Sequence, residues 1–336
     1  MYRLRLKASA FAMSYLSTEE KVRAQVRSLH PHTEKPAPFL GAGGVKVSAV
    51  CFTPRLYKNI RDYITHMNDY VAMAAASGSQ LVAFPELCGM TAMSVMPGFT
   101  TLFADLKRLK DLDIEEQKDA LFTVCETVQG FVGEIFHNTF SQLAQSHRII
   151  IAAGGLFQLE DKRLYNRQFL FSETGEVSGM QDKLFLSPWE KRVGITAGTR
   201  VTPGDTHIGR VAMLGGLSLK HYEPFWIAAT GGCAFAITGA APFIVTDHSL
   251  TRFRAQEQSL CILSPGLCGG QAYGCSFSAP AGIYAPRAAT RSRDGIASEG
   301  IDQAVFTARV DLSRASSQFD LYSDDKNPRF FQRLLQ

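Results

Sequence analysis

Most features that mark specialised classes of protein are missing from this sequence. No apolar run approaches the roughly 18 residues needed to cross a bilayer, so we expect no membrane contact. The net charge is only +4 over 336 residues, and no block of lysine and arginine stands out, which argues against a nucleic-acid partner. The seven cysteines and eight histidines have neither CxxC nor HxxxH spacing, so we expect no metal. The paired glycines lie outside any dinucleotide- or phosphate-binding pattern, and we expect no cofactor.

The cysteines are also too dispersed for a disulfide framework. An odd, scattered set is typical of reduced thiols, so the sequence predicts a cytoplasmic protein. The first 16 residues imitate a signal peptide only faintly, because their apolar part is short and runs into a capping-box pattern at 17–20. A hydrophobic content of 46% and a charged content of 20% are those of an ordinary globular protein with ample core.

We divide the chain into three parts. Residues 1–44 are predicted to be an N-terminal extension, with a short helix over 21–29 and a linker rich in proline and glycine. Residues 45–315 form the main domain, and 316–336 form a polar tail. We expect the extension to pack on the main domain or on a partner subunit.

Strands and helices alternate along the main domain. Valine-rich 45–52 and apolar 80–84 are predicted strands, and the helical spacing of apolar residues over 57–76 predicts the helix between them. Later elements include a helix over 121–147 and two hairpins, one from 165–171 with 177–186 and one from 275–279 with 282–285. This alternation predicts an α/β fold in which helices cover sheets of mixed strand direction.

Three charged residues stand at positions where enzymes often carry out chemistry. Glu86 follows an apolar strand and a proline, at the carboxyl end of the strand, and is placed to act as a general base. Lys183 is flanked by apolar residues and is placed to stabilise negative charge on a tetrahedral intermediate. Glu190 comes seven residues later and is placed to pair with that lysine. Each also has a plainer interpretation: a helix cap or surface acid, an edge-strand lysine, and a solvated acid.

The stretch from Gly209 to Pro224 reads as a short apolar strand, a glycine-rich corner and the start of a helix. Many hydrolases place a nucleophile at such a corner, because the tight turn exposes one side chain and directs backbone N–H groups at the substrate. Here the corner holds Gly215 and Gly216, and the nearby hydroxyl is that of Ser218.

Together, Phe84-Pro85-Glu86, the segment from Lys183 to Glu190 and the strand–corner–helix resemble the nitrilase superfamily of carbon–nitrogen hydrolases. The similarity extends over about residues 45–325 and includes Tyr165-Asn166 ahead of the lysine. It implies a four-layer αββα sandwich that associates as a homodimer or a larger homo-oligomer. It also implies a glutamate base, a lysine and a cysteine nucleophile that act on a small amide or nitrile through an acyl-enzyme.

By motif, Glu86 resembles the family's base, Lys183 the lysine that stabilises the oxyanion, and Glu190 the second glutamate of many members. The family pattern places Gly216 at the nucleophile position, where a cysteine is expected and a glycine has no side chain with which to attack. Three interpretations stay open. The site is disarmed or repurposed; or Ser218, or a water activated by Glu86, replaces the thiol; or position 216 alone has been altered in an otherwise active hydrolase.

Two classes of function follow from this pattern. The first is a carbon–nitrogen hydrolase of a small amide or nitrile whose activity is reduced, altered or absent. The alternative is a non-catalytic relative that binds a small carbonyl or carboxylate ligand through Lys183, or binds a protein partner. An assay of small amides and nitriles, before and after Gly216→Cys, separates the two.

Overall fold

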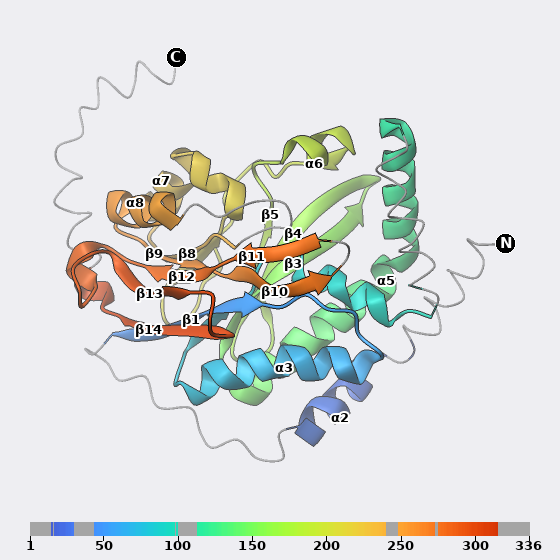
Figure 1. The fold of residues 1–336 in the computed structure, drawn as a ribbon, viewed down its shortest axis with the longest axis horizontal. Helices are drawn as coiled ribbons and strands as arrows, with labels where there is room; N and C mark the ends of the chain where they lie inside the picture. Colours follow the sequence, from blue (N-terminus) through green and yellow to red (C-terminus); the bar gives the residue numbers. More distant parts are fainter. Residues whose placement is uncertain are drawn as a thin grey trace.

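The computed structural model describes residues 15, 17–29, 44–97, 99, 113–239, 248–272 and 275–314. Two sheets lie face to face, and helices cover their outer faces (Figure 1). The larger sheet is covered by α3 (Ile60–Ala76) and α5 (Ile114–His147), and the smaller one by α7 (Glu223–Thr230) and α8 (His248–Gln258). The predicted four-layer αββα sandwich with mixed sheets is thus confirmed.

Nine strands form the larger sheet. They are β1 (Val45–Phe52), β2 (Leu81–Ala83), β3 (Ile150–Glu160), β4 (Arg163–Phe171), β5 (Val177–Asp182), β6 (Ile195–Thr196), β10 (Gly266–Ala272), β11 (Cys275–Ala279) and β14 (Val305–Val310). Their order is β11-β10-β1-β2-β3-β4-β5, with β14 paired to β1 and β6 paired to β4. β1, β2 and β3 are parallel to one another, whereas β3 pairs with β4, and β4 with β5, in antiparallel fashion.

Five strands form the smaller sheet, in the order β13-β12-β9-β8-β7. They are β7 (Arg210–Met213), β8 (Cys233–Ile237), β9 (Cys261–Ser264), β12 (Ala281–Tyr284) and β13 (Ile296–Gly300). β7, β8 and β9 are parallel, and β12 and β13 are antiparallel additions. The carboxyl ends of β2 and β7 each lead directly into a turn that carries a candidate site residue.

The alternation of side chains along β1 explains the layers. Val47 and Ala49 point into the core between the two sheets, while Val50 and Phe52 point into the core under the helices. Because a strand in this position is buried on both faces, most of its side chains are apolar.

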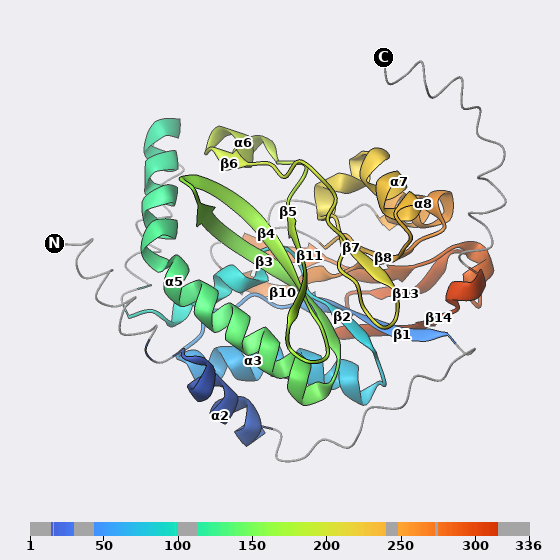
Figure 2. The same cartoon turned by 180° about the vertical axis from the view of Figure 1, so that it is seen from behind.

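Helix α2 (Glu19–Leu29) packs on α5 (Figure 2), so this part of the predicted extension belongs to the core of the main domain. Its Val22 and Val26 are buried in the helical core, and Asn138 of α5 donates to the Ser17 carbonyl at 2.8 Å. The linker and the tail from 316 lie outside the described residues, and the division into three parts stays a prediction. Among the described helices, none has the length and apolarity needed to cross a membrane.

Two helices begin at other residues than the apolar spacing predicts, because polar caps decide where they start. α5 begins at Ile114 instead of 121, since Asp113 and Glu116 form a capping box in which each side chain accepts from the other's backbone N–H. α3 begins at Ile60 instead of 57, since Asn59 caps it by accepting from Asp62 N at 2.9 Å.

The predicted hairpin of 275–279 with 282–285 is wrong. β11 pairs with β10 in the larger sheet, whereas β12 pairs with β9 and β13 in the smaller one. The chain therefore crosses between the sheets at Pro280. A short separation along the chain favours a hairpin, but here β11 pairs with the strand just before it, and β12 pairs with β9 and with the later β13.

The expectation of thiols without a disulfide is wrong for one pair. Cys51 on β1 and Cys268 on β10 are joined, with Cα atoms 5.7 Å apart and a sequence separation of 217. Their strands are parallel neighbours, a relation that no local spacing reveals. The described free cysteines, which are Cys88, Cys125, Cys233 and Cys261, are all buried.

Candidate active site

Glu86, Lys183 and Glu190 meet at one buried point. Lys183 Nζ donates to Glu86 Oε1 at 2.5 Å and to Glu190 Oε1 and Oε2 at 2.9 and 3.0 Å. The three side chains are 0%, 2% and 6% exposed in the order Glu86, Lys183, Glu190. The interpretations as surface acids and an edge-strand lysine are therefore excluded. We call these three residues, with Asn166, the carboxylate–lysine cluster.

Glu86 reaches the cluster because the chain leaves β2 through a turn at Pro85. Phe84 N still donates to Ala152 O at 2.8 Å, which holds the turn against β3. A Cβ atom at Gly154 would lie only 2.0 Å from the Pro85 carbonyl oxygen, so a glycine is required where β3 passes beneath this turn.

Lys183 and Glu190 are positioned by β5 and by the short helix α6 (Pro188–Arg192). Lys183 is the first residue after β5, and its N–H donates to Asn166 O at 2.9 Å. Glu190 closes a capping box: its Oε2 accepts from Ser187 N at 2.7 Å, and its own N–H donates to Ser187 Oγ at 3.2 Å. The cap fixes the carboxylate, and the same carboxylate faces Lys183.

Asn166 is a member of the cluster that sequence reasoning names only as part of a motif, and it misses Gln168, which lies near the cluster on the same strand. Asn166 Nδ2 donates to Glu86 Oε1 at 2.7 Å and to Glu190 Oε1 at 3.2 Å. Both residues are buried, two positions apart on β4, so they lie on the same face of the strand. Two buried polar residues at that spacing in a largely apolar strand are the signal that identifies them.

At the glycine corner, the structure directs Gly215 toward the cluster, not Gly216. Gly215 has φ +72°, and a Cβ atom built on it would lie 3.3 Å from Glu86 Oε2, 3.3 Å from Gln168 Nε2 and 3.9 Å from Lys183 Cγ. A Cβ at Gly216 would lie 2.7 Å from the Gly239 carbonyl oxygen, with no atom of the cluster within 4 Å. Aligning the family pattern from Gly209 places the nucleophile at Gly216. Because Gly215 has a positive φ, however, the Cα–Cβ direction at 215, and not at 216, points to the Glu86 carboxylate.

Ser218 lies in η3 (Gly216–Lys220), the turn of 3-10 helix that follows the corner. Its side chain is buried, and its hydroxyl donates to the Leu214 carbonyl. It forms no hydrogen bond with Glu86 or Lys183, so the structure does not bring it into the cluster as a substitute nucleophile. The end of η3 is instead tied to the lysine segment by His221, whose ring stacks on Phe185 with centroids 3.7 Å apart.

Burial and charge act in opposite directions on the cluster's titrating groups. Burial alone would raise the pKa of Glu190, but the charge of Lys183 and the hydrogen bonds from Ser187 outweigh it and lower that pKa. Burial alone would lower the pKa of Lys183, but the charges of Glu86 and Glu190 outweigh it and raise that pKa. The lysine is therefore an ammonium that holds the cluster together, and the formal charge of two carboxylates and one ammonium is −1.

This balance predicts how stability depends on acid. Since the pKa of Glu190 is lowered from 4.5 on folding, its contribution is present in full above pH 4.5 and is lost as the pH falls below that value. We expect the free energy of unfolding to fall with acid below pH 4.5, and to fall less steeply in Glu190→Gln. Urea unfolding at several pH values measures both slopes, and identical slopes would contradict the pairing with Lys183.

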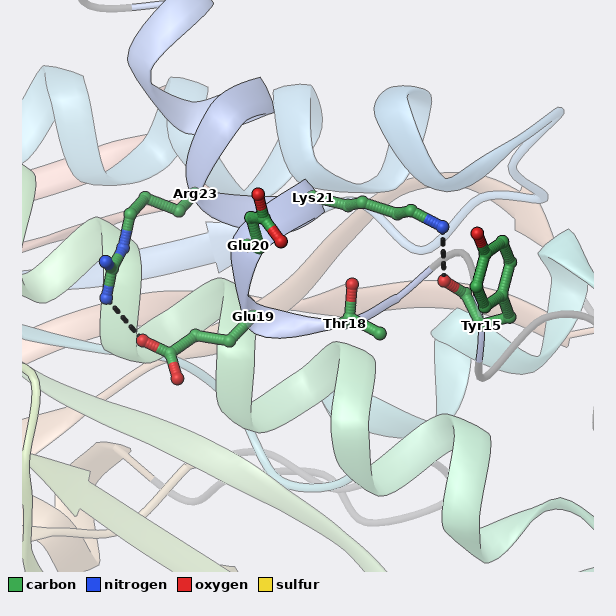
Figure 3. Close-up of a pocket in the computed structure, with 6 residues that line it drawn as sticks. All are labelled: Tyr15, Thr18, Glu19, Glu20, Lys21 and Arg23. Atoms are coloured by element: carbon green, nitrogen blue, oxygen red, sulfur yellow. Dashed lines mark hydrogen bonds and ion pairs between the residues drawn. The ribbon is translucent and has the colours of Figure 1, made fainter.

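A surface pocket lies away from this cluster, at the start of α2 (Figure 3). It is lined by Tyr15, Thr18, Glu19, Glu20, Lys21 and Arg23. Three of its four charged groups are already engaged, because Arg23 pairs with Glu19 and Lys21 donates to the Tyr15 carbonyl at 2.7 Å. It shares no residue with the cluster. In the described part of the chain, no three His, Cys, Asp or Glu side chains are grouped to hold a metal ion.

Comparison with known families matches residues 47–219 to the carbon–nitrogen hydrolase family. The chain belongs to that family. A probable hydrolase of Bacillus subtilis, YhcX, is 24% identical to this family member over 272 residues, which cover 78% of the chain and 48% of YhcX. The chain thus spans about half the length of that curated relative.

Solved structures share the fold of this carbon–nitrogen hydrolase family member at low identity. A carbon–nitrogen hydrolase from Helicobacter pylori has a TM-score of 0.61 and 16% identity, covering 87% of this chain and 98% of its own. An amidase from Nesterenkonia sp. has a TM-score of 0.60 and 16% identity, covering 89% and 100%. The predicted membership of the nitrilase superfamily is confirmed, and at these identities the structural likeness concerns the fold alone.

Proposed function

We propose that the chain is a carbon–nitrogen hydrolase-type protein whose site recognises a small amide or nitrile but does not form a covalent acyl-enzyme. The observation that carries this proposal is the buried contact of Lys183 with both Glu86 and Glu190, beside a corner that has no side chain. In this role Glu86 would be the base, Lys183 would stabilise negative charge, and Glu190 would hold the lysine.

The absence of a nucleophile at the corner supports the non-covalent part of the proposal. Neither Gly215 nor Gly216 has a reactive group, and the Ser218 hydroxyl is committed to the Leu214 carbonyl. Among the described free thiols, Cys88 Sγ donates to Ala153 O at 3.0 Å, and burial raises the pKa of this thiol to about 12. Such a thiol is a poor nucleophile at neutral pH.

A carboxylate ligand, which the sequence admitted as an alternative, finds little support in the cluster. An anion would have to bind beside a cluster in which one ammonium contacts two carboxylates and whose formal charge is −1. A neutral amide or nitrile does not meet this repulsion.

We also propose a homodimer or larger homo-oligomer and a cytoplasmic location. Ile227 on α7 and Phe253 on α8 are 45% and 56% exposed on the outer helical layer, and they support self-association. The buried free cysteines favour a reducing compartment, whereas the Cys51–Cys268 pair counts against one.

Ammonia release from a panel of small amides and nitriles tests the proposed function. The unmodified protein should bind members of the panel and release no ammonia above the uncatalysed rate. Thermal shift measures binding, and a coupled assay measures ammonia. Failure of every amide and nitrile to bind would overturn the recognition of this ligand class, and ammonia release accompanied by an acyl adduct on the protein would overturn the non-covalent assignment.

A further inference from the structure

Four exposed arginines gather at one end of the smaller sheet. Arg252 is on α8, and the other three are on the loop that joins β12 to β13: Arg287, Arg291 and Arg293. We call these four residues the arginine patch. α8 and this loop lie at the same end of the sheet in Figure 1. The sequence does not show the grouping, because α8 and the loop come together only when the chain folds.

Contacts between α8 and the loop hold the patch together. The Arg252 side chain packs against Gly295, with its Cγ 3.1 Å from the Cβ position of that glycine. One turn later on the same face of α8, Gln256 Oε1 accepts from Arg287 N at 2.9 Å. This face of the helix therefore contacts both ends of the loop.

The loop is also bonded to itself, through Thr290, which is 5% exposed. The threonine hydroxyl donates to Arg287 O at 3.1 Å and accepts from Gly295 N at 3.2 Å, and its carbonyl accepts from Arg293 N at 3.3 Å. Arg291 and Arg293 are thus carried on a short, internally bonded turn beside α8.

The charges of the patch are unpaired. None of its four guanidinium groups forms a hydrogen bond or an ion pair with a described residue, whereas exposed arginines such as Arg55 and Arg210 pair with carboxylates. Asp294 lies in the same loop, but its Oδ1 accepts from Ser292 Oγ at 2.6 Å and from Ile296 N at 2.8 Å. Since the whole chain has a net charge of only +4, four unpaired arginines here form a concentrated positive surface.

The edge of β13, which begins where this loop ends, is a second feature of the surface. β13 is the outermost strand of the smaller sheet and pairs only with β12 among the described strands. The outward edge of such a strand has backbone N–H and C=O groups that an extended peptide can pair with. A nucleic acid has no backbone of that kind, and it needs a longer basic surface than one loop provides. A peptide with carboxylates fits both features, because carboxylates pair with guanidinium groups in bidentate fashion.

We infer that the arginine patch and the edge of β13 bind an extended acidic segment of a protein partner. Carboxylates of the segment pair with the guanidinium groups, and its backbone adds to the sheet beside β13. Exposed ion pairs are individually weak, so binding depends on several arginines together. The inference goes beyond the proposed function, because it uses no residue of the carboxylate–lysine cluster.

Fluorescence anisotropy with three labelled peptides of about ten residues tests this on the full chain. The first alternates glutamate with valine, which suits an added strand; the second has glutamine in place of glutamate, and the third has proline in place of valine. In about 50 mM salt the first peptide should bind at least about tenfold more tightly than either of the others. In about 500 mM salt its advantage over the glutamine peptide should fall to about twofold, since salt screens exposed charges.

Reversing two charges of the patch locates the binding. Arg291→Glu with Arg293→Glu should weaken the glutamate peptide at least about tenfold and leave the glutamine peptide within about twofold. Arg27→Glu with Arg61→Glu, on exposed arginines of α2 and α3, changes the net charge equally and should alter neither affinity. Arg291→Gln with Arg293→Gln removes the charges without reversing them and should weaken the glutamate peptide about threefold, which keeps the test available if the reversed variant does not fold.

Equal binding of the glutamate and glutamine peptides, or an equal loss in the control variant, would overturn the inference. Equal binding of the proline peptide would exclude pairing with β13 and overturn it too. Tighter binding of a labelled single-stranded DNA of about ten nucleotides, lost on charge reversal, would assign the patch to nucleic acid instead. A changed sedimentation coefficient of the reversed variant without peptide would assign it to a second copy of the chain. In each case the binding of amides and nitriles, and with it the proposed function, is unaffected.

Discussion

Lys183→Met should lower the free energy of unfolding by about 3–5 kcal/mol, the effect of removing one partner from a buried ion pair. Among the described residues, Lys183 is the only cation that pairs with Glu86 and Glu190, whose side chains are 0% and 6% exposed. Without it, two buried carboxylates repel each other in a medium that solvates neither. Urea unfolding at neutral pH measures the loss.

Two further variants show whether charge or packing causes that loss. Lys220→Met, on an exposed lysine at the end of η3, should change stability by less than about 0.5 kcal/mol. Adding Glu86→Gln and Glu190→Gln to Lys183→Met should restore much of the stability, because no unpaired buried charge then remains. A loss of less than about 1 kcal/mol in Lys183→Met would contradict the central role of this lysine.

Gly215→Cys should create a reactive thiol, whereas Gly216→Cys should not. The new Cβ at 215 would face Glu86 Oε2 at 3.3 Å, so the carboxylate could accept the thiol proton as the thiolate attacks an amide or nitrile carbon. In a well-studied protease, loss of the nucleophile alone costs a factor of about 10⁶ in kcat, so regaining one should have a large effect. Ammonia release and the rate of alkylation by iodoacetamide measure the gain.

The backbone at Gly215 imposes a cost that the controls must match. Its φ of 72° and ψ of 160° are conformations that only glycine adopts freely, so any side chain there should destabilise by about 1–3 kcal/mol. Gly215→Ala has the same strain without the thiol and should stay inactive. Gly216→Cys directs its Cβ at the Gly239 carbonyl, 2.7 Å away. Equal gains at 215 and 216 would contradict the assignment of Gly215.

Those parts of the fold that depend on local pattern could be predicted from the sequence. The bounds of β1 agree with the prediction, because its valine-rich, apolar run favours a strand wherever its partners lie. The partners of β11 and of β12 could not be predicted in this way. β11 pairs with β10 in one sheet, and β12 pairs with β9 and β13 in the other. The Cys51–Cys268 link depends equally on two strands that are neighbours only after folding.

The site followed a similar division. The order of the motifs predicts that Glu86, Lys183 and Glu190 belong to one site, and in the structure Lys183 contacts both glutamates. Spacing along the chain could not say which glycine faces them, because the direction of a Cα–Cβ bond at a corner depends on φ, and Gly215 is left-handed. Gln168 was missed because the sequence does not show which polar residues of β4 are buried, and only the folded strand places Gln168 near Gly215.

Intact-protein mass spectrometry after incubation with propionamide and propionitrile tests the central claim most directly. The claim is that the carboxylate–lysine cluster is intact but the corner beside it has no nucleophile. The account predicts no added mass on the unmodified protein, and an added acyl or imidate mass on Gly215→Cys that peptide mapping places at residue 215. A covalent adduct on the unmodified chain, at any residue, would contradict it.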